Sequence, residues 1–323
     1  MSTGVDEMKF SVIFMGTPYF ASEVLDHLIK REDLDVKAVV TQPDRVVGRK
    51  RKIVYSEVKE LALSHQLSLF QPEKIKDIKE ELEALQADAI ITCAYGQFLP
   101  TSILDLTPHG VINVHASLLP KYRGGAPMQH AIYNGEKTTG ITLMKSALKM
   151  DAGDIYSKIE VKIDPNDTLK IVEQNLIEAA IEILKRDLID IINHKILPIP
   201  QDHDLATFAP VITRENELID FNREASDVVN HIRSLIDNPY AYGYLNGKRV
   251  KICKIDFEIK DHNETTGEVI EFSPESLVVA LKGGLLKIYE LQVEGKALMT
   301  TQQLYPGYHK QWLGQRFTGY EAQ

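Results

Sequence analysis

Residues 10–41 read FSVIFMGTPYFASEVLDHLIKREDLDVKAVVT, and this stretch decides the fold class of the chain. Two runs rich in β-branched residues, 10–15 and 36–41, flank a segment, 20–30, whose apolar residues recur at helical spacing. A helix that connects two strands in this way crosses over the sheet and leaves the strands parallel. The stretch therefore predicts a βαβ unit and, with it, a parallel sheet covered by helices.

The same alternation continues through the first half of the chain. Further strands are expected at 67–70, 89–93, 111–114, 140–144 and 155–163, and further helices at 56–65, 75–86, 126–134 and 168–192. Pro198 and Pro200 follow in a polar stretch without periodicity, which is typical of a connector. We predict a Rossmann-like α/β domain with a mostly parallel sheet over residues 1–192 and a linker over residues 193–208.

The remaining residues, 209–323, have a different pattern. One helix is expected at 225–236, followed by short strands at 242–245, 249–254, 267–271, 276–280 and 285–291. Turn pairs such as Asn246-Gly247 and Gly283-Gly284 separate these strands. Several short strands joined by hairpin turns predict a small barrel that resembles the oligonucleotide-binding (OB) fold.

The composition limits where the protein works and what it binds. The chain has 323 residues and only two cysteines, Cys93 and Cys253, without the spacing of a disulfide framework or a structural metal site. Its start is polar, and the apolar run at 10–15 is shorter than the core of a signal peptide. We expect a cytoplasmic protein with no metal, no membrane contact and no obligate protein partner.

Charge indicates that any contact with nucleic acid is local. The formal net charge is −9, which argues against a protein that binds nucleic acid through its overall field. One segment is an exception, because residues 45–52 contain five cations and no acid. The alternative reading of this segment is a solvated basic loop. From Ala209 onward, 16 acidic residues outnumber 13 basic ones, so the contribution of the second domain to nucleic-acid binding is an open question.

Three polar residues form the candidate catalytic group. Asn113 and His115 stand two apart at the end of an expected strand, so their side chains point to the same side. Asp151 follows in a loop of small residues, from which its carboxylate could orient the imidazole of His115. The alternatives are a pair of hydrogen-bonded core residues and a surface turn.

Several short sequence motifs resemble those of one known family. The run NVHASLLPKYRG at 113–124 resembles the signature of the folate-dependent formyltransferases, and MDAGD at 150–154 follows at the matching distance. FMGTPYF at 14–20, TQPDR at 41–45, AYGQFLP at 94–100 and LATFAP at 205–210 are similar to one branch of that family. The likeness therefore spans nearly the whole chain.

The resemblance implies a reaction and roles for the three polar residues. In that branch, 10-formyltetrahydrofolate donates a formyl group to the α-amino group of initiator methionyl-tRNA, for translation initiation. The family's catalytic residues correspond to Asn113, His115 and Asp151. When an amine attacks a formyl carbon, the carbonyl oxygen gains negative charge, which an amide and a protonated imidazole stabilise. Asp151 would keep His115 charged and correctly oriented.

The resemblance also implies the binding residues. The expected folate contacts are Ser117, Leu118, Leu119, Pro120, Tyr95, Gly96, Gln97, Phe98, Leu99 and Asp154. The expected tRNA contacts are Arg45, Arg49, Lys50, Arg51, Lys52, Lys248 and Arg249. The alternatives are a formyltransferase of the same fold that acts on a sugar or another small amine, a hydrolase of the formylated folate, and an RNA-binding protein without catalysis.

Overall fold

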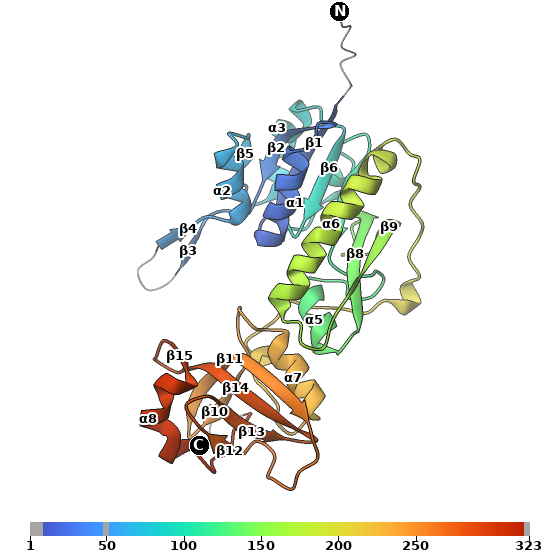
Figure 1. The fold of residues 1–323 in the computed structure, drawn as a ribbon. Coiled ribbons are helices and arrows are strands. Elements are labelled where there is room, and N and C mark those ends of the chain that lie inside the picture. Colours follow the sequence, from blue (N-terminus) through green and yellow to red (C-terminus); the bar gives the residue numbers. More distant parts are fainter. Residues whose placement is uncertain (1–8, 48–51, 320–323) are drawn as a thin grey trace, which may run out of the picture. The chain divides into compact units, whose positions relative to one another are not determined.

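The computed structural model describes residues 9–47 and 52–319 (Figure 1). Contacts between residues divide the chain into two compact units. Unit 1 comprises residues 1–127, 139–161 and 173–210, and unit 2 comprises residues 128–138, 162–172 and 211–323. The functional domain limits given above, 1–192 and 209–323, stay a prediction.

Unit 1 is built on a seven-stranded sheet whose strand order is β5-β2-β1-β6-β7-β8-β9. The first five of these strands run parallel, and β8 is antiparallel to β7. The strands are β1 (Phe10–Gly16), β2 (Leu34–Val40), β5 (Leu69–Phe70), β6 (Ala89–Cys93), β7 (Val111–His115), β8 (Thr138–Lys145) and β9 (Ile155–Lys162). This sheet confirms the predicted Rossmann-like α/β class.

Helices cover both faces of the sheet, which explains why its central strands are mostly apolar, with Thr92, Asn113 and His115 as exceptions near their carboxyl ends. Ile13 and Met15 of β1 pack against Ile75, Leu82 and Ile103 on one face. Figure 1 shows helices α1 and α6 crossing the front of the other face. The helices along this part of the chain are α1 (Tyr19–Ile29), α2 (Glu57–Ser64), the 3₁₀ helix η1 (Ile75–Ile78), α3 (Lys79–Ala84), α4 (Thr101–Leu104), α5 (Pro127–Tyr133), α6 (Leu169–Ile192) and η2 (His203–Leu205).

The strand order creates a place for a site. The chain moves outward from β1 to β5 and then returns to the other side of β1 with β6, so the connections that follow β1 and β6 lead to opposite sides of this pair of strands. Three loops meet at this carboxyl edge. The Thr17 hydroxyl and the Gln42 amide both donate to the carbonyl oxygen of Tyr95, at 3.2 and 3.0 Å. These hydrogen bonds hold the loop that follows β6.

Unit 2 contains an antiparallel sheet in the order β10-β11-β14-β13-β12, with β15 paired to β14. Its elements are η3 (Glu215–Glu217), α7 (Ala225–Arg233), β10 (Tyr242–Leu245), β11 (Lys248–Ile259), β12 (Val269–Phe272), β13 (Leu277–Leu281), β14 (Gly284–Val293), β15 (Leu298–Thr300) and α8 (Thr301–Trp312). The curled sheet and its buried core agree with the predicted OB-like domain.

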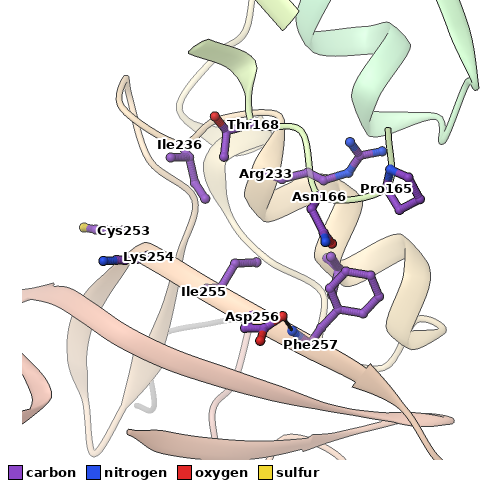
Figure 2. Close-up of a pocket in the computed structure, with 11 residues that line it drawn as sticks. Pro165, Asn166, Thr168, Arg233, Ile236, Cys253, Lys254, Ile255, Asp256 and Phe257 are labelled. Atoms are coloured by element: carbon purple, nitrogen blue, oxygen red, sulfur yellow. Dashed lines mark hydrogen bonds between the residues drawn. The ribbon is translucent and has the colours of Figure 1, made fainter. Parts of the chain in front are cut away.

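A cavity of about 290 Å³ lies within unit 2 (Figure 2). Arg233 lines it, but the guanidinium group donates to the backbone carbonyl oxygens of Asp164 and Asp167, at 3.2 and 2.9 Å. The aromatic ring of Phe257 and the aliphatic side chains of Ile236 and Ile255 also line the cavity. Because Arg233 is already bonded to the turn at 164–167, we assign it a structural role.

Two elements differ from the sequence prediction. The expected basic loop at 45–52 has paired ends: β3 (Arg45–Val47) and β4 (Lys52–Val54) form an antiparallel ribbon, because Val46 and Ile53 favour extended backbone. Helix α8 was not predicted, since Pro306 and Gly307 disfavour a helix. A capping box at Thr300 and the burial of Trp312 stabilise it nonetheless. Among the described residues, none of the helices is both long and apolar enough to cross a membrane.

Gly140 of β8 tests the packing of β8 in unit 1. A Cβ atom there would lie 2.1 Å from the Ile159 carbonyl oxygen and 2.6 Å from Leu118 Cδ2. We expect Gly140→Ala to lower the free energy of unfolding by roughly 1 to 3 kcal/mol or more, measured by urea unfolding. The control is Gly307→Ala in α8, where the added Cβ would face open space. It should be neutral or stabilising. Equal stability of the two variants would contradict the packing described.

Candidate active site

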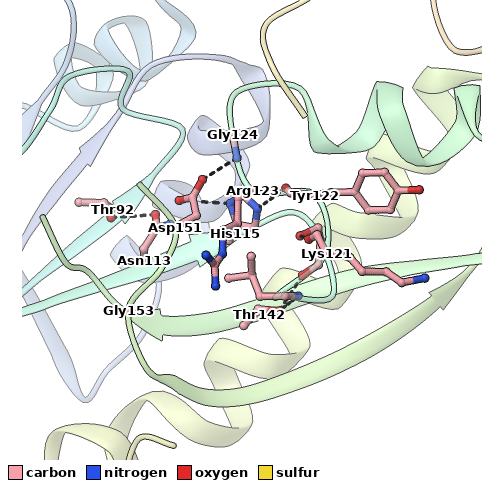
Figure 3. A network of polar contacts seen from close by, with 12 residues as sticks. Thr92, Asn113, His115, Lys121, Tyr122, Arg123, Gly124, Thr142, Asp151 and Gly153 are labelled. Atoms are coloured by element: carbon pink, nitrogen blue, oxygen red, sulfur yellow. Dashed lines mark hydrogen bonds and ion pairs between the residues drawn. The ribbon is translucent and has the colours of Figure 1, made fainter. Parts of the chain in front are cut away.

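Asn113 and His115 lie on β7, as expected, and point to one face of the sheet (Figure 3). Thr92 is the partner of Asn113 on the neighbouring strand β6. The Thr92 hydroxyl donates to Asn113 Oδ1 at 2.9 Å. Because this bond occupies the amide oxygen, the two N–H groups of Asn113 Nδ2 are the part of the side chain that is left for a ligand.

The orientation of His115 is set by a backbone carbonyl. Its side chain is only 7% exposed, and its Nε2 lies 3.0 Å from the carbonyl oxygen of Tyr122. A carbonyl oxygen can only accept, so Nε2 carries the hydrogen and, in the neutral ring, Nδ1 carries the lone pair. The nitrogen that is free to act on a substrate is therefore Nδ1.

Asp151 faces this free nitrogen. Its Oδ1 lies 3.7 Å from His115 Nδ1, and its Oδ2 accepts a hydrogen bond from the backbone N–H of Gly124 at 2.8 Å. A separation of 3.7 Å is too long for a direct hydrogen bond but short enough for a charge to act on the ring. The three polar side chains, Asn113, His115 and Asp151, thus lie together in unit 1.

The loop that carries Asp151 reaches the site along an unexpected path. Strand β8 is antiparallel to β7, so it ends beside the start of β7, where Ser146 N–H donates to the Val111 carbonyl oxygen at 2.8 Å. The loop at 146–154 then returns to the other end of β7, where Asp151 meets His115. Asp151 itself has a φ of +49°, an uncommon conformation for a residue with a side chain.

The loop after β7 is held by several hydrogen bonds that shape it around His115. Ser117 Oγ donates to the Lys121 carbonyl oxygen at 2.7 Å, and the Thr142 hydroxyl links Ser117 and Leu119. Lys158 Nζ donates to the Leu119 carbonyl oxygen. Partial burial lowers the pKa of Lys158. This network keeps the Tyr122 carbonyl oxygen directed at the imidazole.

The predicted folate contacts differ in how accessible they are. Ser117 and Leu119 are fully buried, whereas Leu118, Pro120, Leu99 and Asp154 are half-buried. Gln97 is occupied, because its amide accepts from Ile75 N–H at 2.9 Å and donates to the Pro72 carbonyl oxygen at 3.0 Å. Gly96 is exposed. The contacts of these residues with folate stay a prediction.

Large apolar side chains are exposed on two loops at the site, residues 94–100 after β6 and residues 146–154, which carry Asp151. Phe98 is 67% exposed, Met150 is 70% exposed and Leu148 is 54% exposed. Tyr95 is buried instead, and burial raises the pKa of its hydroxyl. Exposed apolar side chains beside a polar site are typical of a surface that a ligand covers.

The predicted tRNA contacts fall in both units. Arg45 is exposed at the start of β3, and Lys52 begins β4. Three more of the predicted contacts, Arg49, Lys50 and Arg51, lie outside the described residues. In unit 2, Lys248 is exposed, and the guanidinium of Arg249 lies 5.6 Å from the ring centre of Tyr242.

Sequence reasoning missed the groups that hold the catalytic candidates in place. These groups are the Tyr122 carbonyl, the Gly124 N–H and the Thr92 hydroxyl. Backbone groups leave no sequence signal, although the pairing of adjacent strands could have suggested Thr92. The predicted linker at 193–208 belongs to unit 1, and Gln201 within it is buried and bonded to the loop of Asp151.

Cys93 ends β6 beside this site but has no nucleophilic role in our account. Its side chain is fully buried, and burial strongly raises the pKa of its thiol. A thiol needs to ionise to attack a carbon atom. The polar groups of the site therefore suit acid–base and electrostatic catalysis better than covalent catalysis by Cys93.

Comparison with known proteins identifies relatives for both parts of the chain. Residues 8–188 match the family described as formyl transferase, and residues 211–309 match the formyl transferase C-terminal domain. The methionyl-tRNA formyltransferase of Malacoplasma penetrans is 41% identical over 285 residues, which are 88% of this chain and 89% of that protein. The methionyl-tRNA formyltransferase of Streptococcus equi subsp. equi is 44% identical over 290 residues, 89% of this chain and 92% of that protein.

Solved structures share the fold at lower identity. HypX from Aquifex aeolicus in complex with tetrahydrofolic acid matches 95% of this chain with a TM-score of 0.67 at 16% identity, and this chain spans 48% of HypX. An N-formyltransferase from Helicobacter canadensis, in complex with folinic acid and dTDP-3-aminofucose, matches 87% of this chain and 98% of its own, with a TM-score of 0.65 at 19% identity.

Proposed function

Because this chain belongs to the formyl transferase family, we propose that it transfers a formyl group from 10-formyltetrahydrofolate to the α-amino group of initiator methionyl-tRNA. The relatives that carry this name align with most of the chain, including both units. The observation that carries the proposal is the meeting of an amide, an imidazole nitrogen and a carboxylate at Asn113, His115 and Asp151.

The proposed roles follow from the hydrogen bonds that each side chain has already made. Thr92 occupies the oxygen of the Asn113 amide, and Tyr122 occupies Nε2 of His115. Asn113 Nδ2 and protonated His115 Nδ1 are then the donors for the oxygen of the formyl group as it gains negative charge. One such preorganised donor is typically worth about 3 to 4 kcal/mol of the barrier.

Asp151 is proposed to handle the proton. Its Oδ2 is held by the Gly124 N–H, which leaves Oδ1 directed toward His115 Nδ1. A carboxylate in this position stabilises the charged imidazole and can accept the proton that the attacking amine releases. The bond between the formyl carbon and N10 of the folate then breaks, and the proton is returned to N10 as the folate leaves. No covalent bond to the protein is needed.

The acceptor is proposed to be tRNA rather than a small amine. Two features support this choice: the cluster of cations at 45–52 and the OB-like unit. A sugar or other small amine as acceptor, and hydrolysis of the formylated folate, stay the alternatives. Methionyl-tRNA and the folate are the proposed partners, and the proposed location is the cytoplasm.

The function is tested by comparing acceptors. Purified protein should formylate charged initiator methionyl-tRNA at a kcat/KM at least about a thousandfold above free methionine or an amino-sugar nucleotide. The reason is that phosphate contacts add binding energy that small amines lack. The measurement is acid-stable formyl product from labelled 10-formyltetrahydrofolate. Equal rates with a small amine would favour the small-amine reading, and release of formate without any acceptor would favour the hydrolase.

The catalytic assignment is tested by three substitutions. Asn113→Ala, His115→Ala and Asp151→Asn should each lower kcat about a hundredfold or more, the scale of losing one preorganised donor. Folate affinity, measured by calorimetry, should change much less, because these groups act on the reacting carbon. A folded His115→Ala enzyme with near-normal kcat would remove His115 from the mechanism.

A further inference from the structure

A buried glutamine connects the predicted linker to the loop of Asp151. Gln201 is 6% exposed, and its Nε2 donates to the carbonyl oxygens of Asp151 and Gly153, at 2.9 and 2.6 Å. Its Oε1 accepts two hydrogen bonds from Arg123, from Nε at 3.2 Å and from Nη2 at 2.7 Å. The amide thus makes four hydrogen bonds, two through each of its polar atoms.

Arg123 determines which way the amide faces. A guanidinium group only donates, so the glutamine oxygen must point toward it and the glutamine nitrogen toward the two carbonyl oxygens. Arg123 is 2% exposed, and its Nη2 also lies 2.9 Å from His203 Nδ1. No ion pair to Arg123 occurs among the residues that the structure describes. A cation buried in this way is costly unless hydrogen bonds compensate, and here Gln201 and His203 provide them.

The turn that Gln201 holds has little freedom of its own. Asp151 adopts a φ of +49°, which is uncommon for a residue with a side chain. Gly153 approaches β8 so closely that a Cβ atom would lie 1.8 Å from the Lys145 carbonyl oxygen. Because Gln201 bonds to the carbonyls at both ends of this turn, it fixes the backbone from which the Asp151 carboxylate extends.

The same segment also holds the loop that orients His115. Tyr122 N–H donates to Thr207 Oγ1 at 2.9 Å, and Arg123 N–H donates to the Thr207 carbonyl oxygen at 2.9 Å. Ala209 N–H then donates to the Arg123 carbonyl oxygen at 2.7 Å. Residues 201–209, which we call the strap, therefore bind both the loop of Tyr122 and the loop of Asp151.

We propose that the strap sets the position of Asp151 relative to His115 and that Gln201 is its positioning residue. Gln201 acts through Asp151, because both N–H groups of its amide are bonded to the backbone of that loop and its oxygen is bonded to Arg123. The inference rests on the proposed function for its kinetic test, but not for its structural test. The proposal thus gives the strap, whose composition is that of a linker, a part in shaping the active site.

The kinetic test is a double-mutant cycle. Gln201→Met keeps the length of the side chain and removes its donors, so we expect kcat to fall about tenfold to a hundredfold, the scale of a displaced catalytic group. KM for the folate should stay within about threefold. Adding Gln201→Met to Asp151→Asn should cost little more than Asp151→Asn alone, because both changes act on one interaction. The matched control, Gln292→Met in unit 2, removes a surface hydrogen bond to the Lys296 carbonyl and should keep the kcat of the unaltered protein.

A second variant distinguishes the loss of the two hydrogen bonds from simple misfolding. Gln201→Glu removes the same two donors but offers Arg123 a carboxylate, so the fold should persist while kcat falls to a similar degree. Near-ultraviolet circular dichroism reports whether the fold is kept. A kcat within twofold of the unaltered protein in either folded variant would overturn the proposal. The proposal would also fail if the loss of kcat in the double variant equalled the product of the losses in Gln201→Met and Asp151→Asn.

The structural test needs no substrate. Lys149 is exposed in the loop at 146–154, where trypsin can cut once the loop opens. We expect cleavage after Lys149 to be at least about tenfold faster in Gln201→Met than in the unaltered protein or in Gln292→Met. Unchanged cleavage in Gln201→Met would overturn the proposal that Gln201 holds the loop of Asp151. If the unaltered protein formylates no acceptor, the proposed function fails while this measurement still decides the role of Gln201.

Discussion

The hydrogen bond between His115 and the Tyr122 carbonyl oxygen is the interaction on which the site depends. It gives the hydrogen to Nε2 and leaves Nδ1 facing the Asp151 carboxylate. A hydroxyl or amide side chain in this place could present either a donor or an acceptor to Nε2, whereas a backbone carbonyl oxygen can only accept. The loop after β7 is in turn held by Ser117 and Thr142, so the identity of the working nitrogen is built into the backbone.

The sheet supplies the frame for this arrangement. Because β6 and β7 are parallel neighbours, Thr92 stands beside Asn113 and fixes its amide. Because β8 is antiparallel, the loop of Asp151 has to return along β7, and two independent contacts hold it there, Gly124 and Gln201. Unit 2 contributes none of these groups. In the described part of unit 2, some cations are already paired with acids, such as Lys254 with Glu290 at 3.9 Å and Lys282 with Glu224 at 2.5 Å.

The sequence predicted much of the fold because periodicity reports burial directly. The βαβ alternation led to the correct class and to strands such as β6, and hairpin turn pairs revealed the antiparallel unit. Helix α8 was not predicted from the sequence, because the tertiary packing of Trp312 outweighs the local effect of Pro306 and Gly307. The motifs around Asn113, His115 and Asp151 indicated residues that do lie together. The groups that hold them are backbone groups, the Thr92 hydroxyl and the amide of Gln201 in a polar stretch. Such supports depend on three-dimensional contacts, and residue type alone does not reveal them.

The tautomer of His115 is the most direct test of this account, and ¹⁵N NMR of histidine-labelled protein measures it. Comparison with a His115→Gln variant identifies the ring signals, and the spectrum is recorded at alkaline pH, where histidine side chains are generally neutral. The account predicts a proton on Nε2 and a lone pair on Nδ1. A proton on Nδ1 of the neutral ring would contradict it, because Nε2 would then have no hydrogen to donate to the Tyr122 carbonyl oxygen.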